Sequence, residues 1–158
     1  VLPVLASFAN NIVHLGPSGS GHATKAINNV MNATNMLVAT EGLLVLEKFG
    51  VDPVTALSVI NTASGRSLMS MQRLPNEVLS GSFAYGFKLG LMRKDVKIAN
   101  DMLDEHFKAA TMFRETLRLM DEALETIDGV NGESDYTEAC KLLEKKAGTT
   151  LRTSTLIS

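Results

Sequence analysis

The feature that most constrains how this chain can fold is a run without proline, from residue 22 to residue 49, which is followed by Gly50. Its apolar side chains recur at the spacing of a helix, and glycine readily takes the left-handed conformation that ends helices. We predict a single helix over residues 22–49, about 40 Å long at 1.5 Å per residue. The other elements are expected to pack around this helix.

Most of the remaining sequence also has helical spacing. Asp52 and Pro53 supply an N-cap and a proline at the first helical position, which predicts a helix to about residue 62. The segment 68–82 is interrupted by Pro75 and Gly81 and is expected to form short helical turns. Further helices are predicted over residues 2–11, 88–105 and 109–127, and from Ser134 or Asp135 to residue 146.

The N-terminal segment departs from this pattern. Residues 12–15 form a short β-branched run and are predicted to be a strand. A single strand has no partner for its backbone N–H and C=O groups, so we interpret residues 1–15 as the last helix and strand of a preceding α/β domain. Residues 16–150 then form an all-α helical bundle, and residues 151–158 form a tail with little reason to order alone.

Charge and composition exclude several classes of partner. The 15 basic and 17 acidic residues give a formal net charge of −2, so the chain has no basic field that would attract nucleic acid or a membrane surface. Its longest apolar stretches fall far short of the roughly 20 residues that span a bilayer. The single cysteine, Cys140, cannot form an internal disulfide and is expected to be a small apolar filler. We expect a soluble protein of the cytoplasm or an organelle matrix.

Three glycines, Gly16, Gly19 and Gly21, lie just before the long helix in the run GPSGSGHATKAINN. A P-loop would need lysine and then serine or threonine directly after the last glycine, where this chain has histidine and alanine. A dinucleotide fingerprint would need a glycine at position 24, which is Thr24, and a βαβ unit. The glycines are therefore expected to provide a sharp entry into a helix whose first turns approach a ligand.

The helix that follows carries a polar stripe of Lys25, Asn28, Asn29 and Asn32. Residues three and four apart share one helix face, so these side chains lie together. The stripe fits a face that is simply exposed to water. It also fits a ligand-binding cleft, because asparagine is a poor helix former and its amide supplies both donors and acceptors.

This motif resembles that of the β-hydroxyacid dehydrogenases, a family that includes 3-hydroxyisobutyrate dehydrogenases, tartronate semialdehyde reductases and, more distantly, 6-phosphogluconate dehydrogenase. Their pattern G-x-x-G-x-G-x-x-x-K-x-x-x-N is met by Gly16, Gly19, Gly21, Lys25 and Asn29. The resemblance also includes Asn28, the triplet Ser64-Gly65-Arg66, and Phe87 followed by Asp95, and it extends from about residue 2 to residue 152.

The resemblance implies an NAD(P)-dependent 3-hydroxyacid dehydrogenase in which Lys25 exchanges a proton with the substrate hydroxyl and Asn29 holds the substrate. It also implies that NAD or NADP is bound mainly by a Rossmann domain absent from this sequence, of which residues 1–15 are a remnant. The chain alone is then expected to be inactive. The remaining residues with implied roles are the substrate contacts Asn28, Phe87 and Asp95 and the cofactor contacts Gly21, Ser64 and Lys94.

Several of these residues equally fit a purely structural role. Lys94 and Asp95 fit an exposed helix start, Phe87 fits an ordinary core, and Ser64 fits a helix end. The second hypothesis for the whole chain is a non-catalytic helical oligomerisation module. Self-association is expected under both hypotheses, as a homodimer or a larger homo-oligomer.

The sequence does not indicate a metal site, because His14, His22 and His106 lack ligand partners at helical spacing. The substrate is expected to be a small 3-hydroxyacid or semialdehyde. Its identity, and the choice between NAD and NADP, depend on segments outside this sequence.

Overall fold

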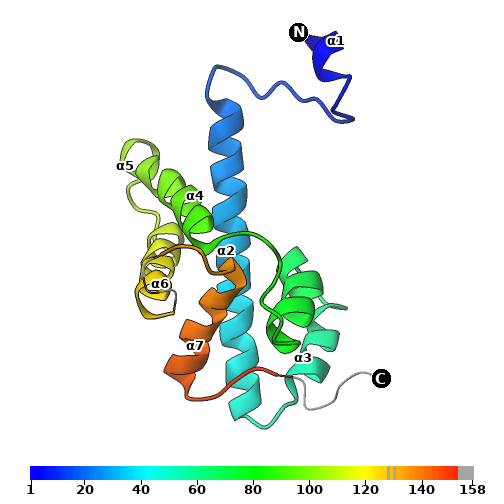
Figure 1. Ribbon diagram of the computed structural model, residues 1–158, viewed down its shortest axis with the longest axis vertical. Coiled ribbons are helices and arrows are strands. Elements are labelled where there is room, and N and C mark those ends of the chain that lie inside the picture. Colours follow the sequence, from blue (N-terminus) through cyan, green and yellow to red (C-terminus); the bar gives the residue numbers. More distant parts are fainter. Residues whose placement is uncertain (128, 130, 153–158) are drawn as a thin grey trace.

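The computed structural model describes residues 1–127, 129 and 131–152, and it is helical throughout its body (Figure 1). Strand-like pairing among these residues is limited to one isolated β-bridge between Lys88 and Asp135. The all-α prediction is confirmed. The elements are α1 (Leu2–Leu5), α2 (Ser20–Lys48), α3 (Pro53–Ile60), η1 (Met69–Leu79), α4 (Leu89–Asp101), α5 (Leu103–His106), α6 (Met112–Thr126), η2 (Tyr136–Glu138) and α7 (Ala139–Ala147).

The long helix α2 organises the molecule, as the sequence predicts. It begins two residues earlier than expected, after a left-handed N-cap at Gly19, and it ends one residue before the predicted end. It lies against α3, η1, α4, α6 and α7. Six of its eight buried positions alternate in steps of four and three, a spacing that keeps one stripe of the helix against its neighbours: Ala26, Val30, Ala33, Leu37, Thr40 and Leu44. Met36 and Leu43 widen this stripe.

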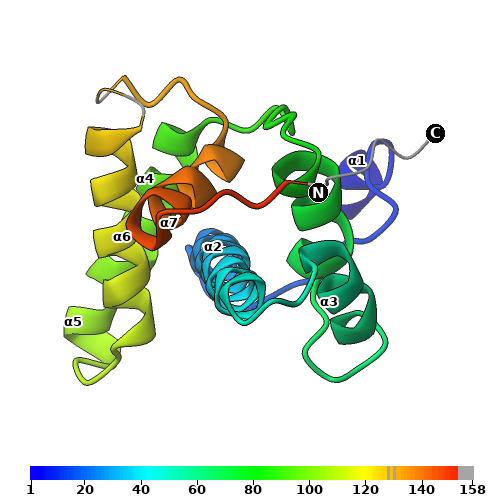
Figure 2. The same cartoon turned by 90° about the horizontal axis from the view of Figure 1, so that it is seen from below.

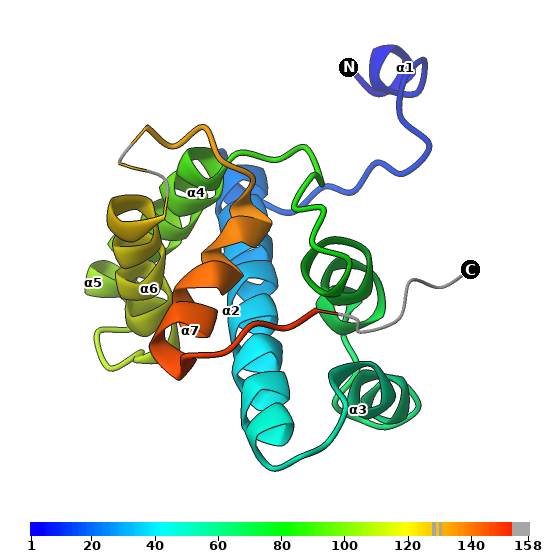
Figure 3. The ribbon, with the colours of Figure 1, turned by 60° about the horizontal axis from the view of Figure 1, so that its bottom comes forward.

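The other helices form two groups around α2. Figure 2, which looks along α2, shows α3 on one side and α4, α5 and α6 on the other. Figure 3 shows α7 lying along α2 beside α6. Among the described residues, no helix is both long and apolar enough to span a bilayer.

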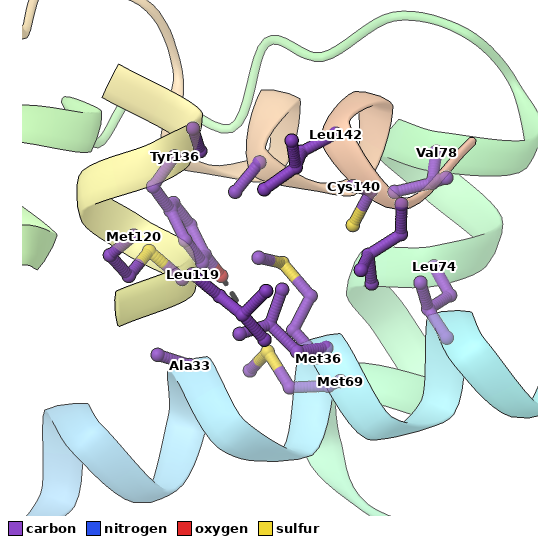
Figure 4. Close-up of a cluster of buried hydrophobic side chains, with 14 of the residues drawn as sticks. Ala33, Met36, Met69, Leu74, Val78, Leu119, Met120, Tyr136, Cys140 and Leu142 are labelled. Carbon is purple, nitrogen blue, oxygen red and sulfur yellow. Dashed lines mark hydrogen bonds between the residues drawn. The ribbon is translucent and has the colours of Figure 1, made fainter. Parts of the chain in front are cut away.

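A sulfur-rich core joins these layers (Figure 4). Met36 of α2, Met69 at the start of η1 and Met120 of α6 are buried together with Tyr136, whose hydroxyl donates to the Met69 sulfur at 3.6 Å. Cys140 is fully buried, which confirms its interpretation as a filler. Burial raises the pKa of its thiol to about 12, so the sulfur remains protonated and inert at neutral pH.

The N-terminal segment differs from its prediction. The expected helix over residues 2–11 is limited to α1, which has no buried residue, and residues 12–15 form no strand. Both differences have one physical reason. A short helix needs tertiary burial to persist, and a strand needs a partner for its backbone groups, and neither is present beside this segment.

Two helices in the middle of the chain also differ from their predictions. Residues 69–79 form one continuous π-helix, although Pro75 predicts an interruption. The wider turn of a π-helix makes room for the proline ring. The helix expected over residues 88–105 is broken at Met102. The buried amide of Asn100 donates to the carbonyls of Val96 and Phe113, which ties the chain into a reversal at this point.

The C-terminal end of the body extends further than predicted. Leu151, expected to lie in the tail, is fully buried, and its N–H donates to Glu144 at 2.9 Å. Arg152 pairs with the same carboxylate at 2.6 Å. These contacts fix the first two residues of the predicted tail, and its remaining residues, 153–158, lie outside the described part of the chain.

Candidate active site

Lys25 and Asn29 project from the first turns of α2 toward Asp95 of α4. The Asn29 amide donates to Asp95 Oδ2 at 2.7 Å, and Lys25 Nζ makes an ion pair with the same oxygen. Lys94 Nζ lies 3.2 Å from the other oxygen of this carboxylate. Four residues with predicted roles are therefore joined in one cluster. Lys25 and Asn29 share a helix face because they are four residues apart.

The loop after α6 positions the start of α4, and with it Asp95. The N–H of Leu89 donates to Ser134 O at 2.7 Å, and the N–H of Gly90 donates to Gly132 O at 3.1 Å. These bonds satisfy two N–H groups that the first turn of a helix leaves free. Gly90 and Gly132 allow the two backbones to approach closely, since a Cβ on Gly90 would lie 3.0 Å from the Gly132 carbonyl oxygen.

Asp95 is the buried centre of the cluster, with only 5% of its side chain exposed. Burial on its own would raise the pKa of this carboxyl. Hydrogen bonds from Lys25, Lys94 and Asn29, and the charge of Lys25, outweigh burial and lower the pKa below its ordinary value. The carboxylate is therefore ionised at neutral pH and orients the three donors around it.

The two lysines lie at the surface, with 61% of Lys25 and 58% of Lys94 exposed. An ammonium group that is fixed by a carboxylate and open on its other side can exchange a proton with a ligand. The two lysines and Asp95 together carry one net positive charge. The cluster can thus hold an anionic ligand and transfer a proton to or from it.

A cavity of about 370 Å³ adjoins the cluster. Asn29 and Asn32 of α2 line one part of it, and Phe87 lines another. The ring of Phe87 is half-buried and packs edge-on against Tyr136, with ring centroids 5.9 Å apart. The polar stripe of α2 therefore does not simply face water: two of its asparagines line a cavity of the size that small ligands occupy.

Three other predicted residues lie outside this cavity. Asn28 is exposed, and its amide donates to Asn29 Oδ1 at 3.3 Å, so it contacts the site through its neighbour. Gly21 lies in the exposed first turn of α2, with open space where a Cβ would be. Ser64 lines a different hollow with Asn35 and Gly42, ten or more residues further along α2 than Lys25. That separation is about 15 Å or more along the helix, so Ser64 does not join the cluster.

Several residues of the cavity were not identified from the sequence. Arg73 of η1, Tyr85 and Tyr136 line it, and the Arg73 guanidinium lies 3.6 Å from the centre of the Tyr85 ring. Each comes from a separate segment, and no local spacing connects them. Among the described residues, no group of three or more His, Cys, Asp or Glu side chains is placed to bind a metal ion.

Comparison with known proteins identifies the family. Residues 19–143 match a family profile described as the NAD-binding domain of NADP-dependent 3-hydroxyisobutyrate dehydrogenase. This match covers well over half of the chain. The chain belongs to the 3-hydroxyisobutyrate dehydrogenase family. The resemblance to β-hydroxyacid dehydrogenases is thereby confirmed, and the description of the profile supports NAD or NADP as the cofactor of the family.

Curated relatives of this family member are longer proteins. A 2-(hydroxymethyl)glutarate dehydrogenase from Eubacterium barkeri is 35% identical over 99 residues, which are 63% of this chain and 33% of that protein. A probable mitochondrial 3-hydroxyisobutyrate dehydrogenase from Arabidopsis thaliana is 32% identical over 112 residues, covering 65% of this chain and 31% of that protein. The matches thus span about a third of each relative.

Solved structures of the family share the fold. The 3-hydroxyisobutyrate dehydrogenase of Mycobacterium tuberculosis, determined with L-serine, superposes with a TM-score of 0.74 at 23% identity, over 89% of this chain and 49% of that one. The Salmonella typhimurium enzyme gives a TM-score of 0.75 at 20% identity, over 89% and 48%. At these identities the similarity establishes the fold, and the chemistry has to be argued from the site.

Proposed function

We propose that this chain is the helical catalytic domain of an NAD(P)-dependent 3-hydroxyacid dehydrogenase, of the 3-hydroxyisobutyrate dehydrogenase or tartronate semialdehyde reductase type. The observation that carries the proposal is the cluster of Lys25 and Asn29 around the buried carboxylate of Asp95, at the edge of a cavity. Interconversion of an alcohol and a carbonyl requires a group that gives or takes the hydroxyl proton, and Lys25 can do this while Asn29 and Asp95 hold it and the substrate in place.

Lys25 is the proposed acid and base. In the direction of reduction, its ammonium group donates a proton to the carbonyl oxygen of the substrate, and in oxidation the amine takes the hydroxyl proton. Its ion pair with Asp95 is made by the protonated form, which is the form that reduction needs. Asn29 orients the substrate oxygen, since its amide lies one turn from Lys25. Asp95 positions both side chains.

A bound nicotinamide cofactor would supply the hydride chemistry at the substrate carbon. The donor chemistry at the rim of the site fits one end of such a cofactor, because Lys94 is exposed and can donate to its oxygens. The first turn of α2 at Gly21 is open to close approach. The rest of the cofactor requires a nucleotide-binding domain, for which the longer relatives have room. We therefore expect no turnover from residues 1–158 alone.

The substrate is proposed to be a small 3-hydroxyacid or the corresponding semialdehyde. The names of the relatives include a compound with one carboxylate, 3-hydroxyisobutyrate, and one with two, 2-(hydroxymethyl)glutarate. Both contain a hydroxymethyl group next to a carbon that carries a carboxylate. The site of this chain fits that shared unit, with Lys25 at the hydroxyl.

The replacement Lys25→Ala in the full-length protein tests this assignment. Loss of a general acid–base group is expected to lower kcat by about a hundred- to ten-thousandfold. Cofactor affinity, followed by fluorescence titration with NADH and NADPH, is expected to change little. The matched control is Lys97→Ala, which removes an exposed lysine of α4 that pairs with Asp101. A Lys25→Ala enzyme that keeps its turnover at saturating substrate would contradict the assignment.

A homo-oligomer is proposed as the working form. Three apolar side chains of α2 at seven-residue spacing, Met31, Val38 and Val45, are each more than half exposed, and we call them the α2 stripe. Seven-residue spacing is typical of helices that pair with one another. The same stripe is the specific observation that favours the second candidate function, a non-catalytic oligomerisation module. Turnover that depends on Lys25 distinguishes the two.

A further inference from the structure

The cavity beside Lys25 contains a cation that the proposed proton transfer does not use. Arg73 of η1 lines the cavity together with Asn29 and Asn32 of α2. Tyr85, whose aromatic ring lies against the Arg73 guanidinium, also lines the cavity. The cavity wall thus combines amide groups on α2 with a guanidinium on η1.

Arg73 is unusual among the half-buried arginines because it has no carboxylate partner. Arg93 pairs with Asp121 at 2.5 Å, and Arg152 pairs with Glu144 at 2.6 Å. No ion pair joins Arg73 to another described residue, and its buried Nε has no hydrogen-bond partner. Buried donors in proteins are nearly always paired, because an unmade hydrogen bond is costly. Arg73 therefore gives the cavity wall a guanidinium with no carboxylate partner among the described residues, and its buried Nε has no acceptor.

Aromatic rings hold this guanidinium in place. Arg73 Cζ lies 3.6 Å from the centroid of the Tyr85 ring, and Tyr85 packs edge-on against Tyr136 at 5.7 Å. Burial raises the pKa of Tyr136 to about 12, although the charge and hydrogen bonding of Arg73 oppose the shift. The Tyr136 hydroxyl is therefore neutral at physiological pH and does not neutralise Arg73. A fixed guanidinium loses little entropy when it binds a planar anion.

The nearby carboxylates are engaged elsewhere. Asp135, which precedes Tyr136, accepts hydrogen bonds from the N–H of Gly86 at 2.7 Å and from Thr137 N–H at 3.0 Å. The residues that line the cavity include no aspartate or glutamate. Arg73 thus adds a second positive charge to the single net charge of the Lys25 cluster. A ligand that matches both charges carries two negative groups.

We propose that Arg73 binds a second carboxylate of the substrate, so that the preferred substrate is a 3-hydroxyacid with two carboxylates. This inference rests on the proposed dehydrogenase function and specifies its substrate class. The hydroxymethyl end of the substrate lies at Lys25 and Asn29, and the distal carboxylate accepts paired hydrogen bonds from the guanidinium. A cavity of about 370 Å³ has room for both ends. Arg73 is then a specificity-determining residue.

Two matched substrates test the proposal on the full-length protein with NAD or NADP. One is 2-(hydroxymethyl)glutarate, and the other is 2-(hydroxymethyl)pentanoate. The two compounds differ only in that a methyl group replaces the second carboxylate. The wild-type kcat/KM is expected to favour the dicarboxylate by about tenfold or more. Arg73→Gln is expected to lower kcat/KM for the dicarboxylate by about ten- to hundredfold, mainly through KM, as for loss of a charge-assisted bond. The kcat/KM of Arg73→Gln for the monocarboxylate is expected to differ from that of the wild type by less than about threefold.

Two further variants separate binding from structure. Arg73→Lys keeps the charge and the aliphatic stem, and it is expected to give an intermediate KM for the dicarboxylate. Arg114→Gln makes the same chemical change at an exposed position of α6, where the arginine pairs with Asp104. Its kcat/KM for both substrates is expected to equal that of the wild type. Circular dichroism checks that each variant is folded.

A binding measurement separates this proposal from the dehydrogenase function. Glutarate, titrated calorimetrically into the full-length protein, is expected to bind about tenfold more weakly to Arg73→Gln than to the wild type. Arg73-dependent glutarate binding without oxidation of any substrate would contradict the dehydrogenase and still support the carboxylate site. The role of Arg73 would be overturned if Arg73→Gln lowered kcat/KM equally for both substrates. It would also be overturned if the wild type oxidised both substrates without preference for the dicarboxylate.

Discussion

Asp95 determines the arrangement of the candidate active site, because it is the acceptor shared by Lys25, Asn29 and Lys94. The replacement Asp95→Asn keeps the size of the side chain and removes its charge. Lys25 then loses its ion pair, and kcat is expected to fall by about tenfold or more. Asp121→Asn, at a half-exposed pair with Arg93, is the control, and it is expected to leave kcat unchanged.

The same replacement has a signature in stability. The pKa of Asp95 lies below its ordinary value of 3.8 in the folded protein, so the ionised carboxylate stabilises the fold above that pH. This stabilisation is lost as the pH falls through the lowered pKa. Thermal midpoints of the wild type are therefore expected to decrease more steeply than those of Asp95→Asn between about pH 5 and pH 2. Parallel curves would count against an ionised, paired Asp95.

At the scale of residues, the sequence indicates which side chains matter better than it indicates how they pair. Lys25 and Asn29 can be connected from spacing alone, because the geometry of one helix relates them. Their contact with Asp95 depends on the packing of α2 against α4, which no local pattern encodes. Arg73 and Tyr136 have no distinguishing spacing at all, and only the folded chain brings them to one cavity.

At the scale of elements, the crossing of α4 over the loop at Gly132 fixes the position of Asp95. Gly90→Ala would place a Cβ 3.0 Å from both the Cα and the carbonyl oxygen of Gly132, so the loop would have to move. Overpacking of this kind is expected to cost about 1–3 kcal/mol of unfolding free energy, measured by urea denaturation. The control is Gly65→Ala, whose Cβ would lie at an ordinary contact distance of 3.6 Å from Ile60. It is expected to change the free energy of unfolding by less than about 0.5 kcal/mol. Equal stability of both variants would show that the close approach is not a constraint.

Elements with explicit end signals could be predicted, and elements that depend on distant contacts could not. The N-cap at Asp52 accepts the N–H of Thr55 at 2.8 Å, as its place before Pro53 predicts. The π-helix over Met69–Leu79 could not be predicted, because its proline indicates an interruption when only local propensity is considered. The segment before α2 shows the converse: helical and strand propensity over residues 2–15 produce little regular structure without a surface to pack on.

At the scale of the whole molecule, α2 serves two purposes on different sides. One side carries the buried positions that hold the bundle together, and its first turns carry Lys25 and Asn29, the proposed catalytic side chains. The α2 stripe of Met31, Val38 and Val45 lies outside that packing and remains exposed. A second copy that covers the stripe would therefore lie on the same helix as Lys25, and assembly would restrict the motion of that helix.

The last prediction concerns this assembly. Val38→Glu places a charge at the centre of the α2 stripe, and burial of an unpaired charge between two copies is strongly unfavourable. The variant is expected to shift the full-length protein toward monomer in size-exclusion chromatography with light scattering, with an unchanged helical spectrum. Ile98→Glu makes a comparable change at an exposed apolar side chain of α4 and is expected to leave the mass unchanged. If Val38→Glu keeps the wild-type mass, or the wild type is itself a monomer at micromolar concentration, the stripe is not an oligomer interface.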